Sequence, residues 1–209
     1  MRMRKQLTKG KRPLFVFDLD STITRREILP LLAEEAGLGE EMAALTERAM
    51  DGRDDFAQSF ARRVSMLSHL SVSRACARVA QVEVYPEIAA FLTSNRERCL
   101  IVTGNLDVWI DALLDRLGMR GRCVCSHAEV RDDRVRALTH ILDKREAAKR
   151  LAQPYIAVGD GENDLGLFAF AGLSVGFGGA RRLSPRVRRA VDIVIDDEEA
   201  LVRFLQAFV

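Results

Sequence analysis

The segment from Leu14 to Thr22, with the sequence LFVFDLDST, places the strongest constraint on the fold. A short apolar run that ends in a turn is typical of an interior strand of a parallel sheet. Open α/β sheets bind ligands beyond the carboxyl ends of their strands, so we expect Asp18 and Asp20 to lie at a binding site. Two carboxylates this close repel each other, which indicates a bound cation, two separated pKa values, or both. A lone strand-terminal aspartate often only caps a helix, but the cluster of two acids and two hydroxyls is harder to explain in that way.

Strand and helix patterns alternate at both ends of the chain, and helical periodicity fills the middle. Further strands are predicted at residues 99–103, 122–126, 155–158, 173–177 and 191–195, with a hairpin over 129–138. Helix-period residues run from 26 to 70, with a break near Gly52, and continue over 72–80. This order predicts an α/β fold with a doubly wound, mainly parallel sheet. We assign residues 1–21 and 86–209 to the core and residues 22–85 to an inserted helical cap.

Composition restricts the class of protein. The chain has 209 residues, of which 48% are hydrophobic and 30% charged, and this suits a globular core rather than a disordered chain. The net charge is only +2, although residues 1–12 alone carry six Lys or Arg. Such a short basic arm is more typical of a solvated terminus than of a nucleic-acid or membrane partner site. No apolar run resembles a signal peptide or approaches the roughly 20 residues of a membrane span, so we expect a cytoplasmic protein without a membrane partner.

A second acidic cluster, GDGEND at Gly159 to Asp164, follows the predicted strand YIAV. Asp160 is therefore another carboxylate at a strand end. If its strand neighbours the first, Asp18 and Asp160 can approach one hard cation, and Mg²⁺ with few protein ligands suits such a site. Asp164 could orient the shell around the cation. Taken alone, the segment is equally well explained as a glycine-rich turn with Asn163 and Asp164 capping the next helix.

Two further polar positions point to an anion. Thr103 and Gly104 end the predicted strand CLIVT and offer a hydroxyl and backbone N–H groups. Lys144 lies at the start of a predicted helix, where the helix dipole disfavours a cation, so a counter-anion is expected nearby. A solvated surface lysine is the alternative for Lys144 when that position is considered alone.

In this order, DLDST, Thr103-Gly104, Lys144 and GDGEND resemble the four motifs of the haloacid dehalogenase superfamily of phosphatases. Glu27 and the segment from Met50 to Leu67 resemble the helical cap of its phosphoserine phosphatases, so the resemblance covers nearly the whole chain. It implies a Mg²⁺-dependent phosphomonoester hydrolase. Asp18 would be the nucleophile that becomes a phosphoaspartate, and Asp20 would act as acid and then as base.

The resemblance also implies the remaining roles. Mg²⁺ would be held by Asp18, the main-chain carbonyl of Asp20 and Asp160. The phosphoryl oxygens would bind Thr103, Gly104 and Lys144, with Asn163 and Asp164 holding the loop and the lysine. In the cap, the substrate carboxylate would bind Arg63 and its amino group Glu27, with Met50 and Phe56 closing the site.

Arg63 also stands out by itself, because it interrupts an apolar helical stripe formed by Phe56, Phe60 and Leu67. A guanidinium on an apolar helix face is expected to pair with a carboxylate. The alternatives are an Arg63 that extends past core residues or pairs with Glu27 alone. Asn105 departs from the family, which usually has glycine there, and adds a side chain toward the substrate.

The sequence leaves several functions open. The substrate is expected to be phosphoserine or a related small phosphorylated amino acid or metabolite. A phosphotransferase that passes the phosphoryl group to an amino alcohol such as homoserine is the alternative enzyme, and a non-catalytic binding protein on the same fold is another. Monomer and homodimer are both open. Residues 181–189 carry five arginines without aromatic residues, which predicts a solvated helix or loop beside the site rather than an RNA-binding surface.

Overall fold

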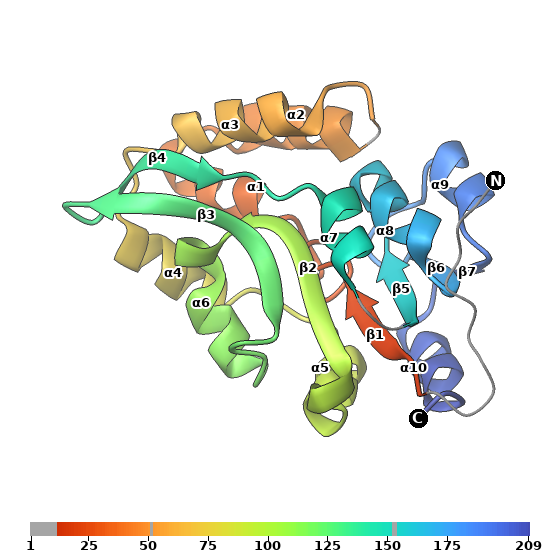
Figure 1. The fold of residues 1–209 in the computed structure, drawn as a ribbon. Helices are drawn as coiled ribbons and strands as arrows, with labels where there is room; N and C mark the ends of the chain where they lie inside the picture. Colours follow the sequence, from red (N-terminus) through yellow and green to blue (C-terminus); the bar gives the residue numbers. More distant parts are fainter. Residues whose placement is uncertain (1–11, 51, 152–153) are drawn as a thin grey trace.

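A computed structural model describes residues 12–50, 52–151 and 154–209 (Figure 1). The basic arm and Asp51 fall outside the described residues, apart from Arg12. The strands are β1 (Leu14–Phe17), β2 (Cys99–Leu106), β3 (Cys123–Arg131), β4 (Arg134–His140), β5 (Tyr155–Gly159), β6 (Leu173–Phe177) and β7 (Ile193–Ile195). The α-helices are α1 (Ile28–Ala33), α2 (Gly39–Met50), α3 (Phe56–Met66), α4 (Val72–Ala80), α5 (Pro86–Ser94), α6 (Asp107–Arg116), α7 (Lys144–Arg150), α8 (Leu165–Phe170), α9 (Pro185–Ala190) and α10 (Glu198–Gln206). Short 3₁₀ helices are η1 (Glu34–Ala36), η2 (Arg96–Arg98) and η3 (Glu162–Asp164).

Within the described residues the strands form one seven-stranded sheet in the order β4-β3-β2-β1-β5-β6-β7. All neighbouring pairs are parallel except β3 and β4. The chain leaves β1 for β2 on one side and later adds β5 on the other, so strand order reverses at β1. This confirms the predicted doubly wound sheet and puts β1 at the point where such sheets bind ligands.

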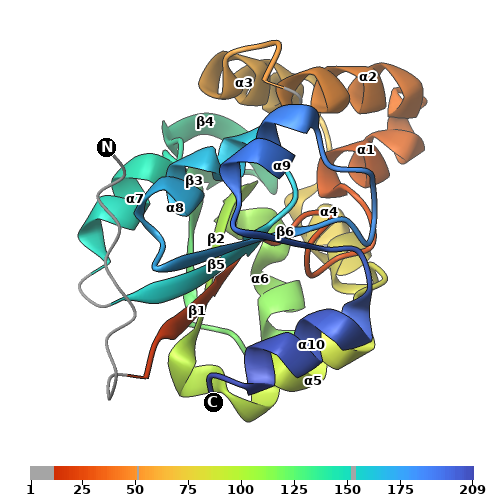
Figure 2. The ribbon, with the colours of Figure 1, turned by 90° about the vertical axis from the view of Figure 1, so that its right-hand side faces the viewer.

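Helices cover both faces of the sheet because the apolar residues of β1 alternate between them. Phe15 and Phe17 belong to a buried cluster that includes residues of α5, α6 and α10, whereas Val16 packs with residues of α7, α8 and α9. The two helix layers lie on opposite sides of the strands in Figure 2. A strand buried on both faces reads as a continuous apolar run, which is why the LFVF segment predicts this position.

Strand register brings the ends of three strands to one level. Phe17 of β1 pairs with both Ile101 of β2 and Val158 of β5, so the residues that follow each of them emerge along the same edge. The predicted end of β2 is wrong, because the strand continues through Thr103, Gly104 and Asn105 to Leu106. The register against β3 shifts between Val102 and Leu106, and this irregularity turns polar residues of β2 toward the site without ending the strand.

Helices α1, α2 and α3 lie over the edge of the sheet where the parallel strands end (Figure 1). They come from residues that the sequence assigns to the cap. Helix α4, also from that range, packs instead against α6 beside the sheet, and its Ala75 and Val79 join the main buried cluster. The segment that covers the site is therefore tied to the sheet through α4, and the limits of the cap at residues 22 and 85 stay a prediction.

The predicted hairpin turns at Asp132 and Asp133, both with positive φ, as expected for a tight connection between two strands. The tip contacts the start of α4. Asp133 accepts hydrogen bonds from the backbone N–H and the hydroxyl of Ser73, at 2.9 Å each, and from the Ser71 hydroxyl. The hairpin thus holds the chain where it passes from α3 to α4.

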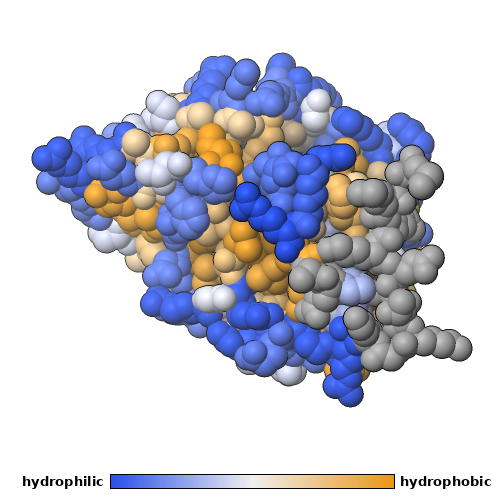
Figure 3. All heavy atoms as spheres, in the orientation of Figure 1, coloured by the Kyte–Doolittle hydropathy of each residue, from blue (hydrophilic) through white to orange (hydrophobic). Residues whose placement is uncertain are grey.

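Hydrophilic residues cover the outward side of α2 and α3 at the top of Figure 3, and hydrophobic residues show in the band beneath them. This pattern fits helices that bury one face against the sheet. Among the described residues, none of the helices has the combined length and apolar character that crossing a bilayer requires.

Candidate active site

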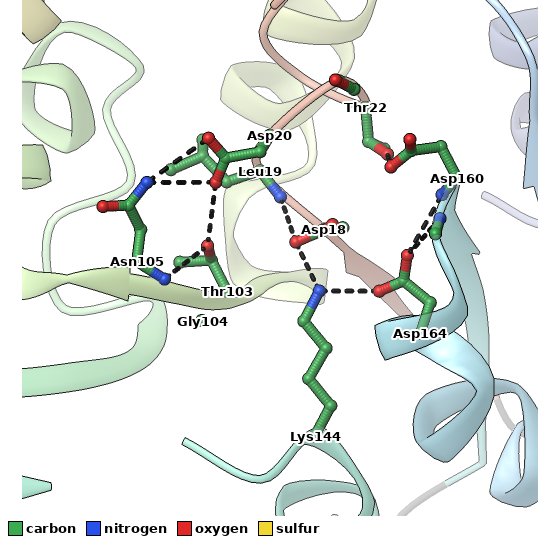
Figure 4. A network of polar contacts seen from close by, with 12 residues as sticks. Asp18, Leu19, Asp20, Thr22, Thr103, Gly104, Asn105, Lys144, Asp160 and Asp164 are labelled. Atoms are coloured by element: carbon green, nitrogen blue, oxygen red, sulfur yellow. Dashed lines mark hydrogen bonds and ion pairs between the residues drawn. The ribbon is translucent and has the colours of Figure 1, made fainter. Parts of the chain in front are cut away.

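Lys144 lies at the centre of the site, at the first residue of α7 (Figure 4). Its Nζ lies 2.6 Å from Asp18 Oδ1 and 2.7 Å from Asp164 Oδ1, and its side chain is buried. Burial by itself lowers the pKa of Lys144, but the two ion pairs outweigh it and raise that pKa above its usual range. The lysine is therefore a fixed positive charge between two carboxylates.

Asp18 follows β1, and its two carboxylate oxygens have different hydrogen-bond partners. Oδ1 accepts hydrogen bonds from the Leu19 backbone N–H, at 2.8 Å, and from Lys144. Oδ2 is buried without a hydrogen-bond partner among the described residues. Burial raises the pKa of Asp18 well above its usual value, the charge of Asp164 raises it further, and Lys144 lowers it. A buried carboxylate oxygen without a donor is costly, so it needs either a cation or a reaction partner.

The GDGEND loop is shaped by Asp164. Its Oδ2 accepts the backbone N–H groups of Asp160 and Gly161, at 3.1 and 3.0 Å, while Oδ1 receives Lys144. Gly159 must be glycine, because a Cβ there would lie only 2.5 Å from Asp164 Cγ. Asp164 therefore performs the loop-holding and lysine-holding contacts that the sequence assigned jointly to it and Asn163. The Oδ1 of Asn163 is buried and has no hydrogen-bond partner among the described residues.

Asp160 carries two contacts that the sequence did not predict. Thr22 donates its hydroxyl to Asp160 Oδ1 at 3.4 Å, and Arg181 Nε lies 2.7 Å from Asp160 Oδ2. Burial raises the pKa of Asp160 to about 6, partly opposed by Arg181. Thr22 belongs to the DLDST segment, so the sequence pattern could have identified it. No feature of the sequence around Arg181 indicates that this residue contacts Asp160.

The carboxylates fit a divalent cation. Ligand oxygens of Asp18, Asp160 and Asp164 all lie within 4.8 Å of one another and are buried. Asp164 holds Lys144 and two backbone N–H groups, whereas Asp18 Oδ2 has no described partner and Asp160 Oδ1 accepts one long hydrogen bond of 3.4 Å, so Asp18 and Asp160 are the better metal ligands. Two carboxylates completed by water and a phosphate oxygen match the habits of Mg²⁺.

Asp20 turns away from this acidic cluster toward β2 (Figure 4). Its carboxylate accepts the Ile28 backbone N–H at 2.8 Å, the Asn105 side-chain amide at 3.2 and 3.3 Å, and the Thr103 hydroxyl at 3.4 Å. Burial raises the pKa of Asp20, and the hydrogen bonds from Ile28 and Asn105 lower it. Its side chain is thus held apart from the carboxylates of Asp18 and Asp160, and metal ligation through its main-chain carbonyl stays a prediction.

Asn105 was predicted to face the substrate, and it also lines the pocket described below. Its side-chain amide, however, donates hydrogen bonds to the carboxylate of Asp20. The residue that departs from the family pattern therefore orients the expected acid and base, a contact that sequence spacing could not reveal.

Gly104 is the point where a cap helix meets the sheet. A Cβ at Gly104 would fall well inside 3.0 Å of the Phe56 ring, so only glycine allows α3 to approach β2 this closely. The Gly104 carbonyl accepts a hydrogen bond from Ser126 at 2.7 Å, and Ser126 accepts the Leu142 backbone N–H at 2.9 Å. Ser126, which the sequence analysis missed, thereby fixes the backbone of this part of β2.

Most of the predicted residues line one small cavity of about 20 Å³. Leu29 and Phe60 join it without having been predicted. The predicted lining residues are Asp18, Asp20, Glu27, Phe56, Arg63, Thr103, Gly104, Asn105 and Asn163. Lys144, Asp160 and Asp164 lie around Asp18 rather than in this lining, and the side chain of Met50 is outside the described residues.

Arg63 is 3% exposed, so it does not extend to solvent. It donates from Nη1 to the Thr46 hydroxyl at 3.0 Å and from Nε to the Ser59 carbonyl at 3.3 Å. Within the described part of the chain, no carboxylate lies within ion-pair distance of it. The alternative of a pair with Glu27 alone is therefore not observed, and burial lowers the pKa of Arg63.

Glu27 precedes α1 and accepts the Ser21 hydroxyl at 2.8 Å. Burial, followed by the charges of Asp20 and Asp160, raises the pKa of Glu27 from 4.5 to about 8. The site thus combines Arg63, a buried cation without an ion-paired carboxylate among the described residues, and Glu27, a buried acid whose pKa is raised.

Residues 15–169 match the model of one protein family, haloacid dehalogenase-like hydrolase. The chain belongs to this family. The match covers the motif residues on β1, β2, α7 and η3.

Among the curated haloacid dehalogenase-like relatives, a phosphoserine phosphatase of Methanocaldococcus jannaschii is 29% identical over 90% of this chain and 94% of that protein. One of Halobacterium salinarum is 30% identical over 92% and 96%. Several other curated phosphoserine phosphatases are longer, and the chain spans 46% to 61% of their length. A solved structure described as a phospho-aspartyl intermediate analogue of phosphoserine phosphatase has a TM-score of 0.81, at 25% identity and covering 93% and 99% of the two chains. These findings confirm the predicted family, fold class and enzyme class, a phosphatase.

Proposed function

We propose that this protein hydrolyses phosphoserine or a close phosphorylated α-amino acid, with Mg²⁺ as cofactor and Asp18 as nucleophile. The observation that carries the proposal is the presence of both Arg63 and Glu27 in the lining of the cavity that contains Asp18 and Asp20. The phosphoserine phosphatases among the relatives support this substrate class.

An α-amino acid supplies the charges that the cavity lacks. Its carboxylate would neutralise the buried Arg63 guanidinium, and guanidinium–carboxylate pairs are among the strongest charge-assisted contacts in proteins. Its ammonium group would lie beside Glu27 and return the pKa of that acid toward its ordinary value. A simple phosphate ester of an alcohol would leave both groups uncompensated.

The reaction follows from the positions of Asp18, Asp20 and Lys144. Asp18 Oδ2 attacks phosphorus and the bond to the substrate oxygen breaks, while Lys144 balances charge beside Oδ1. Asp20 donates its proton to the departing serine oxygen, and its raised pKa suits that role. Asp20 then takes a proton from the water that attacks the phosphoaspartate, which releases phosphate and restores Asp18. Mg²⁺, held by Asp18 and Asp160, would supply positive charge at the phosphoryl oxygens.

Substrate entry requires movement in this proposal. A cavity of about 20 Å³ has room for roughly one water molecule, much less than an amino-acid phosphate occupies. Phe56 closes it by lying on Gly104. We propose that residues 22–85 act as the cap, with α3 lifting from β2 to admit the substrate and returning to exclude water.

Phosphate release tests the proposal. Purified protein is assayed with and without Mg²⁺ on phosphoserine, on phosphoethanolamine, which lacks the carboxylate, and on phosphoglycolate, which lacks the amine. We expect phosphoserine to have the highest kcat/KM, and Asp18→Asn to lower kcat at least about 10³-fold. Asp111→Asn, on an exposed acid that pairs with Arg120, is the matched control and should leave activity unchanged.

Ordinary turnover by Asp18→Asn would end the proposed mechanism. If all amino-acid phosphates are inert while other esters are cleaved, the roles of Arg63 and Glu27 are wrong and the mechanism survives. Transfer of the phosphoryl group to added homoserine in preference to water would identify the enzyme as a phosphotransferase instead.

A further inference from the structure

A second, much larger cavity lies beside the catalytic one. It has a volume of about 1070 Å³, and its lining among the described residues includes seven arginines and three glutamates. Five of these arginines come from residues 181–189, which lie between β6 and β7, and the other two are Arg26 and Arg53 of the helical segment. Pro30 of α1 and Thr46 of α2 line the same cavity as the arginines of α9. The two groups of arginines therefore share one basin.

The basin is connected to the catalytic residues. Glu27 lines both cavities, and Arg181 of the basin reaches Asp160. Glu162, in η3 beside the catalytic loop, pairs with Arg186 at 2.7 Å and accepts the Ser184 hydroxyl at 3.1 Å. A ligand held in the basin would therefore lie next to the reacting phosphoryl group.

Three arginines of the basin have no acidic partner among the described residues. Arg26, Arg181 and Arg186 pair with Glu34, Asp160 and Glu162, but Arg182, Arg188 and Arg189 are exposed and pair with no acid in the part of the chain that the structure describes. Guanidinium groups gathered in a concave site repel one another and concentrate the field of their charge. Their planar, multidentate geometry suits carboxylate and phosphate oxygens, and a phosphate group brings about two negative charges to offset them.

We propose that this basin is a binding site for a small, multiply charged phosphate compound. Its volume is at the upper end of the range of small-molecule pockets. Its described lining contains no aromatic side chain on which a nucleic-acid base could stack. The phosphate groups can belong to the substrate itself or to a separate ligand, and both sources present the same chemistry.

Calorimetric titration with inorganic tripolyphosphate, in metal-free buffer, tests binding without turnover. We expect Arg182→Gln with Arg189→Gln to weaken binding about tenfold or more, because two charge-assisted contacts are lost. The double variant Arg150→Gln with Arg203→Gln removes the same charge from exposed positions outside the basin and should bind like the wild type. Equal affinities in all three proteins, equal losses in both double variants, or tighter binding of a single-stranded RNA 12-mer would each overturn the proposal.

Steady-state kinetics then identify the source of the phosphate. Only this part of the experiment depends on the proposed function. If the ligand is part of the substrate, KM for phosphoserine rises in the basin variant and stays unchanged in the control double variant. If the ligand is a separate molecule, KM for phosphoserine is unchanged in the basin variant although tripolyphosphate binding is lost. Loss of the proposed phosphatase activity would leave the calorimetric result standing.

Discussion

The ring of Phe56 in α3 lies directly on the backbone of Gly104 in β2, with no space for a Cβ between them. This contact joins the helices over the site to the strand that carries Thr103 and Asn105. Phe56 also stacks on Phe60, with ring centroids 5.6 Å apart, so the ring cannot shift without moving its neighbour. The close packing of α3 on β2, which keeps the cavity beside Asp18 small, thus depends on the glycine at position 104.

Gly104→Ala should therefore hold α3 away from β2. We expect it to raise KM for phosphoserine and to lower the free energy of unfolding by about 1–3 kcal/mol, as overpacking does. Adding Phe56→Leu to Gly104→Ala provides room for the methyl group and should recover part of both effects. Steady-state kinetics and urea unfolding measure them, and strictly additive losses in the double variant would contradict the contact.

Lys144→Met should destabilise the protein strongly, because it leaves Asp18 and Asp164 as buried carboxylates without a counter-charge. Removing one partner of a buried ion pair costs about 3–5 kcal/mol. Lys149→Met is the matched control on the same helix, where the exposed Lys149 pairs with Glu146, and should cost less than about 0.5 kcal/mol. Urea unfolding compares the two variants, and similar midpoints would show that Lys144 is not the counter-charge of the site.

Arg63→Gln should alter substrate preference rather than chemistry. We expect KM for phosphoserine to rise about tenfold or more, since a charge-assisted contact to the substrate carboxylate is lost. KM for phosphoethanolamine, which has no carboxylate, should change little. Arg62→Gln, on the adjacent exposed position of α3, serves as the control in the same assay. An equal rise in KM for both substrates would assign Arg63 a structural role only.

Glu27 should make the stability of the ligand-free protein depend on pH. Its pKa is 4.5 in an ordinary environment and about 8 in the folded protein. The folded state therefore holds an extra proton between these values, and the free energy of unfolding falls as pH rises from 4.5 through 8. Glu27→Gln removes this dependence, so the Tm of the wild type should drop relative to that variant across this window.

Thermal melts in EDTA measure the effect, with Glu47→Gln as a control at an exposed acid. The Tm difference between wild type and Glu47→Gln should stay constant with pH. Parallel curves for wild type and Glu27→Gln would show that Glu27 titrates normally in the folded protein.

Much of the fold was predictable from local pattern. The strands β1 and β5 are continuous apolar runs because both faces of the sheet are covered, and the turn at Asp132 and Asp133 follows from residues that tolerate positive φ. The end of β2 was mispredicted because the apolar run stops at Thr103, so Gly104 and Asn105 were placed beyond the strand. Pairing with β3 across a register shift keeps them in the strand, and that pairing is invisible to local pattern.

The sequence by itself determined which reactive side chains the protein has and where each lies along the chain. Carboxylates directly after apolar strands must collect at one edge of a parallel sheet, and Asp18 and Asp160 do so. Tertiary structure decided the partner of each group. Asn105 bonds to Asp20 across 85 residues and Thr22 to Asp160 across 138, while Arg181 reaches Asp160 from beyond β6. Such contacts depend on strand order and side-chain packing, which arise only when distant segments are brought together by folding.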